Sequence, residues 1–246
     1  MPARMGCPGG RGAQRPLGTA MTAKGIEGAR LLVVGATGAL GHLAAQELHA
    51  RGALLALAGR NEQRLAACSE ALGGPARLID AYDLDGCAAL APWALQELGA
   101  LNGVLVLVGV AGFGRAEDVP DAVAEHVFSV NFLCPAAVLR GAVACVAEGG
   151  FLAAATGAIV DRPMLGTADY AASKTALSCW LGVVAREGRA RRLQVLDFRL
   201  PHLETGFSDR PVTGSAPALP TGADPGAAVH AMVGQLAEAA DRGARA

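Results

Sequence analysis

Short apolar runs alternate with longer amphipathic stretches along most of this chain. Apolar runs of strand length occupy residues 31–36, 53–58, 76–81, 103–110, 151–155 and 193–200. Between and after them, apolar residues recur with the period of a helix over residues 39–51, 61–72, 87–98, 120–130, 132–147, 169–186 and 224–240. Alternating strands and helices predict βαβ units, and near-continuous apolar strands predict a parallel sheet buried on both faces. We therefore expect an α/β fold, a doubly wound parallel sheet flanked by helices on both faces.

Two segments depart from this alternation. Residues 1–24 are rich in Gly, Pro and Arg, have no apolar periodicity and lack the apolar core of a secretion signal. We expect a disordered extension there, or a working chain that begins near Met21, and a single domain over residues 25–246. Residues 201–224 carry four prolines in a long connection, which in a compact domain is typical of a lid or binding loop. We expect this loop to cover a substrate.

Composition narrows the class of protein. Hydrophobic residues make up 52% of the chain and charged residues 17%, which is enough for a large core. The formal net charge of -1 argues against nucleic-acid binding. No apolar run approaches the roughly 18 residues that cross a bilayer, so we expect no membrane partner either. The six cysteines are scattered, without CxxC pairs or nearby histidines, which predicts buried thiols in a reducing cytoplasm and no metal site.

A glycine-rich turn, VGATGALG at residues 34–41, joins the first predicted strand to the first predicted helix. Glycines in this place let the backbone turn tightly and approach a pyrophosphate, whose charge then lies at the helix N-terminus. The same turn without a ligand is the alternative, and the absence of a GKS or GKT sequence argues against a nucleoside triphosphate. The turn favours a Rossmann-like dinucleotide site, with cofactor contacts expected from Gly35, Thr37, Gly38, Ala39, Leu40 and Gly41.

The end of the second predicted strand indicates which dinucleotide this is. Gly59 stands where an NAD enzyme usually has a carboxylate for the adenosine ribose, whereas Arg60, followed by Asn61, can pair with a 2′-phosphate. These residues favour NADP(H) over NAD(H), although Arg60 could also simply solvate the strand end. Asp83 and Leu84, just beyond the third strand, are placed to lie along the adenine, unless they form an ordinary polar loop.

Tyr170 and Lys174 lie four residues apart in the predicted helix at 169–186, so both side chains share one face. A nearby ammonium favours the phenolate and lowers the pKa of a tyrosine toward working pH. Such a tyrosine can donate a proton to a carbonyl oxygen or remove one from an alcohol. The alternative is a Tyr and a Lys on a solvated helix face.

The segment Tyr170-Ala-Ala-Ser-Lys174 resembles the YxxxK signature of the short-chain dehydrogenase/reductase family, and the match covers residues 31 to about 205 with the elements in order. The resemblance implies that Lys174 also binds the nicotinamide ribose. It implies that Asn131 holds a water in a proton relay to the lysine, with a purely structural asparagine as the competitor. It further implies cofactor contacts for three loop residues, Ala111, Gly112 and Thr205.

Departures from the family pattern bear on the chemistry. Gly157 stands thirteen residues before the tyrosine, where the family usually has a serine that hydrogen-bonds the substrate carbonyl. Either Thr156 supplies the missing hydroxyl, which we favour, or Tyr170 holds the oxyanion alone with a loss on the order of 10²-fold in rate. Gly109 and Val110 replace the two asparagines of the family's NNAG sequence.

The leading interpretation is an NADP-dependent oxidoreductase that interconverts a small-molecule carbonyl compound and an alcohol. A catalytically weak NADP-binding regulatory or scaffold protein on the same fold is the alternative. Epimerisation or dehydration ranks last, because the short C-terminal region leaves little room for a larger substrate domain. The apolar, proline-rich loop at 201–224 favours a hydrophobic substrate. The family suggests a homo-oligomer, a dimer or tetramer, and the lack of a predicted seventh strand weakens that expectation.

Overall fold

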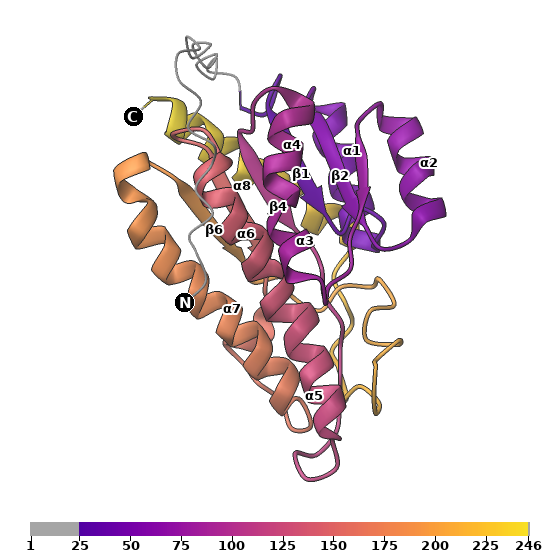
Figure 1. Ribbon diagram of the computed structural model, residues 1–246. Coiled ribbons are helices and arrows are strands. Elements are labelled where there is room, and N and C mark those ends of the chain that lie inside the picture. The colour runs from indigo at the N-terminus through magenta and orange to yellow at the C-terminus, as the bar shows by residue number, and fades with distance from the viewer. Residues whose placement is uncertain (1–24, 246) are drawn as a thin grey trace.

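A six-stranded parallel sheet forms the centre of the molecule (Figure 1) in the computed structural model, which describes residues 25–245. The strand order is β3-β2-β1-β4-β5-β6, so the chain starts in the middle, builds one side and then crosses to the other. This reversal between β1 and β4 confirms the doubly wound sheet, and ligand sites of such sheets lie at the carboxyl ends of the strands there. The strands are β1 (Arg30–Val34), β2 (Leu54–Gly59), β3 (Ala76–Leu78), β4 (Gly103–Val106), β5 (Phe151–Ala155) and β6 (Gln194–Phe198). The extension expected at residues 1–24 lies outside the described residues.

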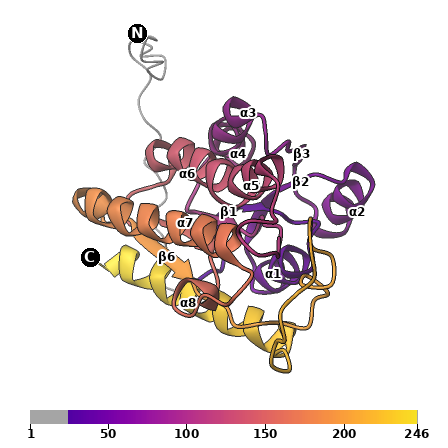
Figure 2. The same cartoon turned by 90° about the horizontal axis from the view of Figure 1, so that it is seen from below.

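Helices cover both faces of this sheet (Figures 1 and 2). Helices α1, α2 and α8 lie on one face, and α3, α4, α6 and α7 lie on the other, whereas α5 extends beyond the strand ends. The α-helices are α1 (Ala39–Ala50), α2 (Glu62–Leu72), α3 (Leu84–Ala88), α4 (Leu90–Leu98), α5 (Asp121–Phe128), α6 (Cys134–Cys145), α7 (Ala168–Glu187) and α8 (Pro225–Arg245). Three short helical segments complete the set, η1 (Ser129–Leu133), η2 (Ala158–Val160) and η3 (Gly188–Arg191).

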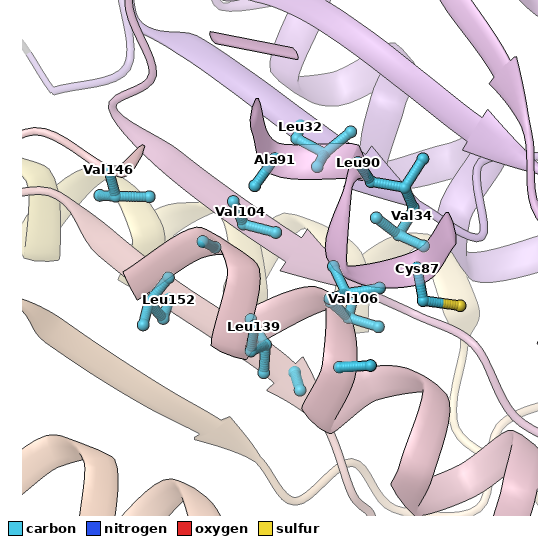
Figure 3. Packing of buried hydrophobic residues seen from close by; sticks show 14 of the residues in the cluster. Leu32, Val34, Cys87, Leu90, Ala91, Val104, Val106, Leu139, Val146 and Leu152 are labelled. Carbon is cyan, nitrogen blue, oxygen red and sulfur yellow. The ribbon is translucent and has the colours of Figure 1, made fainter. Parts of the chain in front are cut away.

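Successive residues of β1 contribute to opposite cores. Leu32 and Val34 pack with residues of α4 and α6 (Figure 3), while Leu31 and Val33 pack with residues of α1 and α8. All four side chains are buried, because neighbouring residues of a strand point to opposite faces and both faces are covered. This double burial accounts for the near-continuous apolar pattern of the strands.

Two strands, β3 and β4, are shorter than the apolar pattern predicts. The strand expected at 76–81 is only Ala76–Leu78, because it is an edge strand with exposed residues that pairs with β2 alone. The strand expected at 103–110 ends at Val106, and the single helix expected at 87–98 is two helices, α3 and α4. Beyond β6, the described chain forms a loop and then α8, and no seventh strand.

One helical stretch is longer and more apolar than the sequence pattern predicted. Asp121–Cys145, which comprise α5, η1 and α6, form 25 residues of continuous helix with a mean hydropathy of 1.6 in the most apolar window. By length and composition alone this stretch is apolar enough to cross a membrane, whereas the sequence pattern predicted no run of that length. However, 56% of that window is buried in the protein, and α6 packs against α3, α4, β4 and β5. Its apolar residues therefore belong to the core.

The start of α1 packs unusually close to the turn that precedes it. A Cβ at Gly41 would lie 2.0 Å from the carbonyl oxygen of Gly35 and 2.6 Å from its carbonyl carbon. Both contacts are to backbone, which cannot move aside without displacing the turn or the helix. Gly41 is therefore required for α1 to approach β1 this closely.

We expect Gly41→Ala to lower the free energy of unfolding by about 1–3 kcal/mol, since it overpacks a rigid contact. Gly182→Ala is the matched control, because Gly182 is an exposed position inside α7 with no atom within 4 Å of the added Cβ. That control should stabilise the protein by about 0.5–1 kcal/mol through helix propensity. Equilibrium denaturation in urea measures both values, and equal unfolding midpoints for the two variants would contradict the expectation.

Candidate active site

The glycine-rich turn leaves the sheet where the strand order reverses. Gly35 has a φ of +92°, a left-handed conformation that favours glycine, and a Cβ there would lie 2.9 Å from the backbone of Leu107. The N–H groups of Gly35 and Ala36 donate to the carbonyl oxygen of Ala58 at 2.8 and 3.0 Å, which holds the turn against β2. Gly38 is the N-cap of α1 and has no side chain to cover the helix end. The first N–H groups of the helix are therefore available to a pyrophosphate, so the turn fits a dinucleotide.

The residues that follow this turn stay accessible. Thr37 and Leu40 are half-buried and Gly38 and Ala39 are exposed, whereas Gly41 is buried beneath them. Thus the structure brings the expected cofactor residues to one surface, with Gly41 acting through the packing of α1.

The end of β2 is shaped around Thr37. A Cβ at Gly59 would lie 2.7 Å from Thr37 Cγ2 and 2.9 Å from Thr37 Oγ1, so any side chain at residue 59 would require the Thr37 side chain to move. Arg60 is exposed, and the Asn61 side chain caps α2 by accepting a hydrogen bond from the N–H of Arg64 at 2.8 Å. The Arg64 guanidinium itself reaches the carbonyl oxygen of Thr37 at 3.4 Å. The Arg64 guanidinium therefore lies at the edge of this turn, and Arg60 is exposed at the end of β2.

Asp83 has a structural partner in addition to any cofactor. Its carboxylate caps α3 by accepting a hydrogen bond from the N–H of Gly86 at 2.9 Å. Leu84 follows it with 39% of its surface exposed. Both residues lie at the surface after β3, as expected for residues that contact an adenine. The helix cap alone, however, is a sufficient structural role for the Asp83 carboxylate.

Tyr170 and Lys174 occupy successive turns of α7, and Tyr170 lies among aromatic rings. The ring of Phe113 meets it edge-on, with centroids 6.3 Å apart and planes at 68°. The ring of Phe207, from the loop after β6, lies on it with centroids 6.2 Å apart. Only 4% of the chain is aromatic, so three aromatic rings at one point mark this place as distinct from the aliphatic core.

Burial moves the pKa values of the two residues apart. Desolvation raises the pKa of Tyr170 to about 12, and desolvation lowers the pKa of Lys174 to about 8 against the opposing charge of Asp197. The pKa of Tyr170 thus departs in the direction opposite to the lowering expected from Lys174, and desolvation is the cause. Lys174 is only 4% exposed, and its Nζ donates to the carbonyl oxygen of Ala155 at 3.2 Å.

Asn131 joins three parts of the site. It lies in η1, a π-helical turn between α5 and α6, and is fully buried. Its Oδ1 accepts from the N–H of Val110 at 2.9 Å, and its Nδ2 donates to Val110 O at 3.0 Å and to Ser173 Oγ at 3.1 Å. A Cβ at Gly109 would lie 3.1 Å from Lys174 Nζ and 3.3 Å from Asn131 Oδ1. Asn131 thus fixes the loop after β4 against α7, directly beside the lysine.

The structure gives Thr156 a role that differs from the expected one. Its hydroxyl donates to Asp197 Oδ1 at 2.5 Å, so its only proton is directed at a carboxylate of β6 and away from a substrate. Gly157 has a φ of +114°, which side-chain-bearing residues rarely adopt, and a Cβ there would meet only Leu200 O at 3.7 Å and Ile159 at 3.9 Å. This geometry argues against Thr156 as the replacement for the family's serine.

The long loop after β6 lies over the end of the sheet, beside α5 (Figure 1). Its two ends are joined by hydrogen bonds between Ala223 and residues 202 and 204, of 2.8 and 3.2 Å. Its middle is attached to the loop after β4, where Val212 N–H donates to Ala111 O at 2.8 Å and Phe113 N–H donates to Thr213 O at 3.0 Å. The loop therefore packs against the expected cofactor contacts Ala111 and Gly112. Thr205, half-buried near its start, is placed in the same loop.

Sequence reasoning missed three residues of this site. Arg64 follows Arg60 by one helical turn, and that spacing was a usable signal. Phe113 directly follows the expected contact Gly112, but nothing in its neighbours predicts that it meets Tyr170. Asp197 lies in an apolar strand, where an acidic residue indicates either a functional group or a buried partner.

The family model described as short chain dehydrogenase matches residues 29–211 of this chain. Dehydrogenase/reductase SDR family member 7B of Mus musculus is 25% identical over 199 residues, which are 76% of this chain and 62% of that protein. The chain thus spans less than two thirds of this relative's length.

Two solved structures share the fold. A short-chain dehydrogenase from Burkholderia cenocepacia, in complex with NADP, has a TM-score of 0.77 at 23% identity and covers 90% of this chain and 99% of its own. An alcohol dehydrogenase from Thermococcus sibiricus, complexed with 5-hydroxy-NADP, has a TM-score of 0.76 at 20% identity and covers 85% and 91%. Since the family model matches well over half of its residues, the chain belongs to the short-chain dehydrogenase family.

Proposed function

We propose that this chain is an NADP-dependent oxidoreductase that interconverts a carbonyl compound and an alcohol. The observation that carries the proposal is the group formed by Tyr170, Lys174 and Asn131. The tyrosine and lysine lie one turn apart on α7, and Asn131 ties that helix to the loop after β4, at the same strand ends as the glycine-rich turn. Tyr170 and Lys174, which can both give up or accept a proton, thus lie beside a turn that fits a dinucleotide.

The cofactor residues support NADP(H) as the dinucleotide. The turn at Gly35, Gly38 and Gly41 would hold the pyrophosphate, while Arg60 and Arg64 supply positive charge at the end of β2. Gly59 supplies no carboxylate for an unphosphorylated ribose, and the Thr37 side chain occupies the space beside it. The structures from Burkholderia cenocepacia and Thermococcus sibiricus, which hold NADP and 5-hydroxy-NADP, support the same choice. When bound, the nicotinamide supplies the hydride.

Tyr170 is the proton donor in the reduction. Because its pKa is raised to about 12, the hydroxyl stays protonated at neutral pH and can hydrogen-bond the carbonyl oxygen of a substrate. As the oxygen gains negative charge, the proton passes from the Tyr170 hydroxyl to it. The Lys174 ammonium stabilises the phenolate that remains. Proton return to Tyr170 completes the cycle.

The substrate is an apolar carbonyl compound. Phe113 and Phe207 flank the Tyr170 hydroxyl-bearing ring, and the loop at 201–224 forms a lid over it. Three further apolar residues in the loops before α7 and after β6 are exposed, Met164, Leu165 and Val212. A surface of this kind favours a ring or alkyl chain next to the carbonyl over a small charged acid. The cytoplasmic location and the homo-oligomer remain predictions from the sequence.

A catalytically weak NADP-binding protein is the second candidate. It is favoured by Gly157, which carries no hydroxyl, and by Thr156, whose hydroxyl is bound to Asp197. Under this alternative the site binds the cofactor but reduces carbonyl compounds slowly, because an oxyanion donor is missing.

We expect Tyr170→Phe to lower the rate of carbonyl reduction by about 10²-fold or more, because the proton donor is lost. NADPH binding should be nearly unchanged. Oxidation of NADPH in the presence of a panel of aromatic and alkyl ketones measures turnover, and fluorescence titration measures binding. Tight NADPH binding without turnover in the unaltered protein would support the catalytically weak alternative, and equal turnover of the two proteins would exclude Tyr170 as the donor.

Arg60→Ala tests the cofactor preference. We expect it to weaken NADPH binding by about 10-fold or more, since it removes a charge-assisted hydrogen bond worth about 1.5–3 kcal/mol. NADH binding should change less than twofold. Isothermal titration with both cofactors, beside Arg140→Ala on α6 as a charge-matched control, measures the difference. Equal weakening for NADPH and NADH would show that Arg60 does not bind a 2′-phosphate.

The pH dependence of reduction follows from the two pKa values. Tyr170 stays protonated throughout the range from pH 6 to 10, whereas the Lys174 ammonium loses its proton as the pH rises through about 8. We therefore expect kcat/KM for ketone reduction to be level below about pH 8 and to fall above it. A stopped assay across this range measures the profile. A level profile up to pH 10 would show that the charge of Lys174 is not required.

A further inference from the structure

Asp197 is a half-buried carboxylate held by three donors. It lies on β6, where it pairs in register with Ala154 of β5. Its Oδ1 accepts from the Thr156 hydroxyl at 2.5 Å. Its Oδ2 accepts from the Ser178 hydroxyl at 2.6 Å and from Arg199 Nε at 3.3 Å. Every one of these partners donates, which is the pattern that an ionised carboxylate requires.

The same carboxylate lies next to the buried lysine. Ser178 follows Lys174 by one turn of α7, so the two side chains leave the same face of that helix. The Lys174 ammonium donates to Ala155 O at 3.2 Å, and Ala155 pairs with Phe198, the neighbour of Asp197 on β6. The lysine and the aspartate therefore lie in the same space between β5, β6 and α7.

Lys174 forms no ion pair with any described residue. Its side chain is 4% exposed, and the one hydrogen bond that its ammonium makes among those residues is to a neutral carbonyl. Burying a charge without a partner favours the neutral amine. The charge of Asp197 opposes this effect and raises the pKa of Lys174, although burial still brings that pKa to about 8.

The other groups around Lys174 do not supply negative charge. On α7 its neighbours are Tyr170, whose hydroxyl stays protonated, and Ser173. From η1 comes the neutral amide of Asn131, and the loop after β4 contributes the backbone of Gly109. Behind Asp197, Arg199 forms an ion pair with Asp161 as well as with Asp197. Asp197 is thus the carboxylate that faces this space.

We propose that Asp197 is a positioning residue whose fixed carboxylate keeps the buried Lys174 charged. Thr156, directly after β5, and Ser178 on α7 hold the carboxylate in place, and Arg199 shields its other side from the protein surface. This role also explains Thr156, which acts through Asp197 and not on the substrate. The electrostatic part of the proposal concerns Lys174 alone, and its catalytic consequence rests on the proposed oxidoreductase function.

The lysine content of the chain makes a direct test available. Only two lysines occur in the sequence, Lys24 and Lys174. Protein labelled with [ε-13C]lysine will therefore give two side-chain signals, and Lys24→Arg assigns them by removing one. A pH titration of the remaining signal measures the pKa of Lys174 in the full chain without substrate or turnover.

In Asp197→Asn, which keeps the shape and acceptor oxygen, we expect Lys174 to titrate lower by about one pH unit, the low end of the effect of one nearby charge. Asp161→Asn is the matched control, because it removes an exposed carboxylate from the far side of Arg199. Its effect on Lys174 should be less than a third as large. An unchanged titration in Asp197→Asn, or equal shifts in both variants, would overturn the proposal.

A second variant, expected to shift the pKa of Lys174 in the opposite direction, keeps the test usable if Asp197→Asn does not fold. Arg199→Gln removes a positive charge beside Asp197, while Thr156 and Ser178 remain to hold the carboxylate. We expect Lys174 to titrate at higher pH in this variant, which general damage to the site would not produce. If Asp197→Asn does not fold, as judged by circular dichroism, Arg199→Gln decides alone, and an unchanged or lower titration overturns the proposal.

The kinetic consequence is measured separately. If the protein reduces ketones, the fall of kcat/KM at high pH should begin about one pH unit lower in Asp197→Asn than in the unaltered chain. If no ketone is reduced by any variant, the proposed function fails, whereas the titration of Lys174 still supports or overturns the role of Asp197.

Discussion

The candidate site depends on the hydrogen bonds of one buried amide. Asn131 binds the N–H and the carbonyl oxygen of Val110 and also the hydroxyl of Ser173, so it joins η1, the loop after β4 and α7. Without these bonds the backbone of Val110 would have two polar groups lacking a partner, each costing about 1–3 kcal/mol if buried. The π-helical turn at η1 is what aims Asn131 at this loop. The π-helical turn in this core helix therefore contributes directly to the arrangement of residues around Lys174.

Burial, more than pairing, controls the electrostatics of this site. It raises the pKa of Tyr170 and lowers that of Lys174, so each residue is held closer to its neutral form. A neutral tyrosine suits a proton donor. A neutral lysine would not stabilise a phenolate, which is why a carboxylate on the neighbouring strand matters. In the proposed mechanism, the carboxylate of Asp197 on β6 lets a neutral Tyr170 and a charged Lys174 lie within two turns of α7.

Much of the fold and part of the site could be predicted from the sequence, for identifiable reasons. The strands of a sheet covered on both faces are apolar at nearly every residue, and β1, β2, β5 and β6 were found by that property. The glycine turn and the Tyr170–Lys174 spacing are local, so sequence neighbours reveal them. The length of β3 depends on its having one partner strand, which no local pattern shows. The role of Thr156 depends on Asp197 of β6, 41 residues away, to which its hydroxyl donates. The aromatic surroundings of Tyr170 depend on rings brought in from two distant loops.

The backbone at Gly157 has a consequence for how this protein can change. A φ of +114° is open to glycine and strained for other residues, and a Cβ at this residue would approach the carbonyl oxygen of Leu200, in the loop after β6, at 3.7 Å. A serine placed at residue 157 would therefore need the main chain to rotate before its hydroxyl could reach a substrate. Restoring a hydroxyl at this position is thus a change of backbone as well as of side chain, opposed by conformation and not by lack of space.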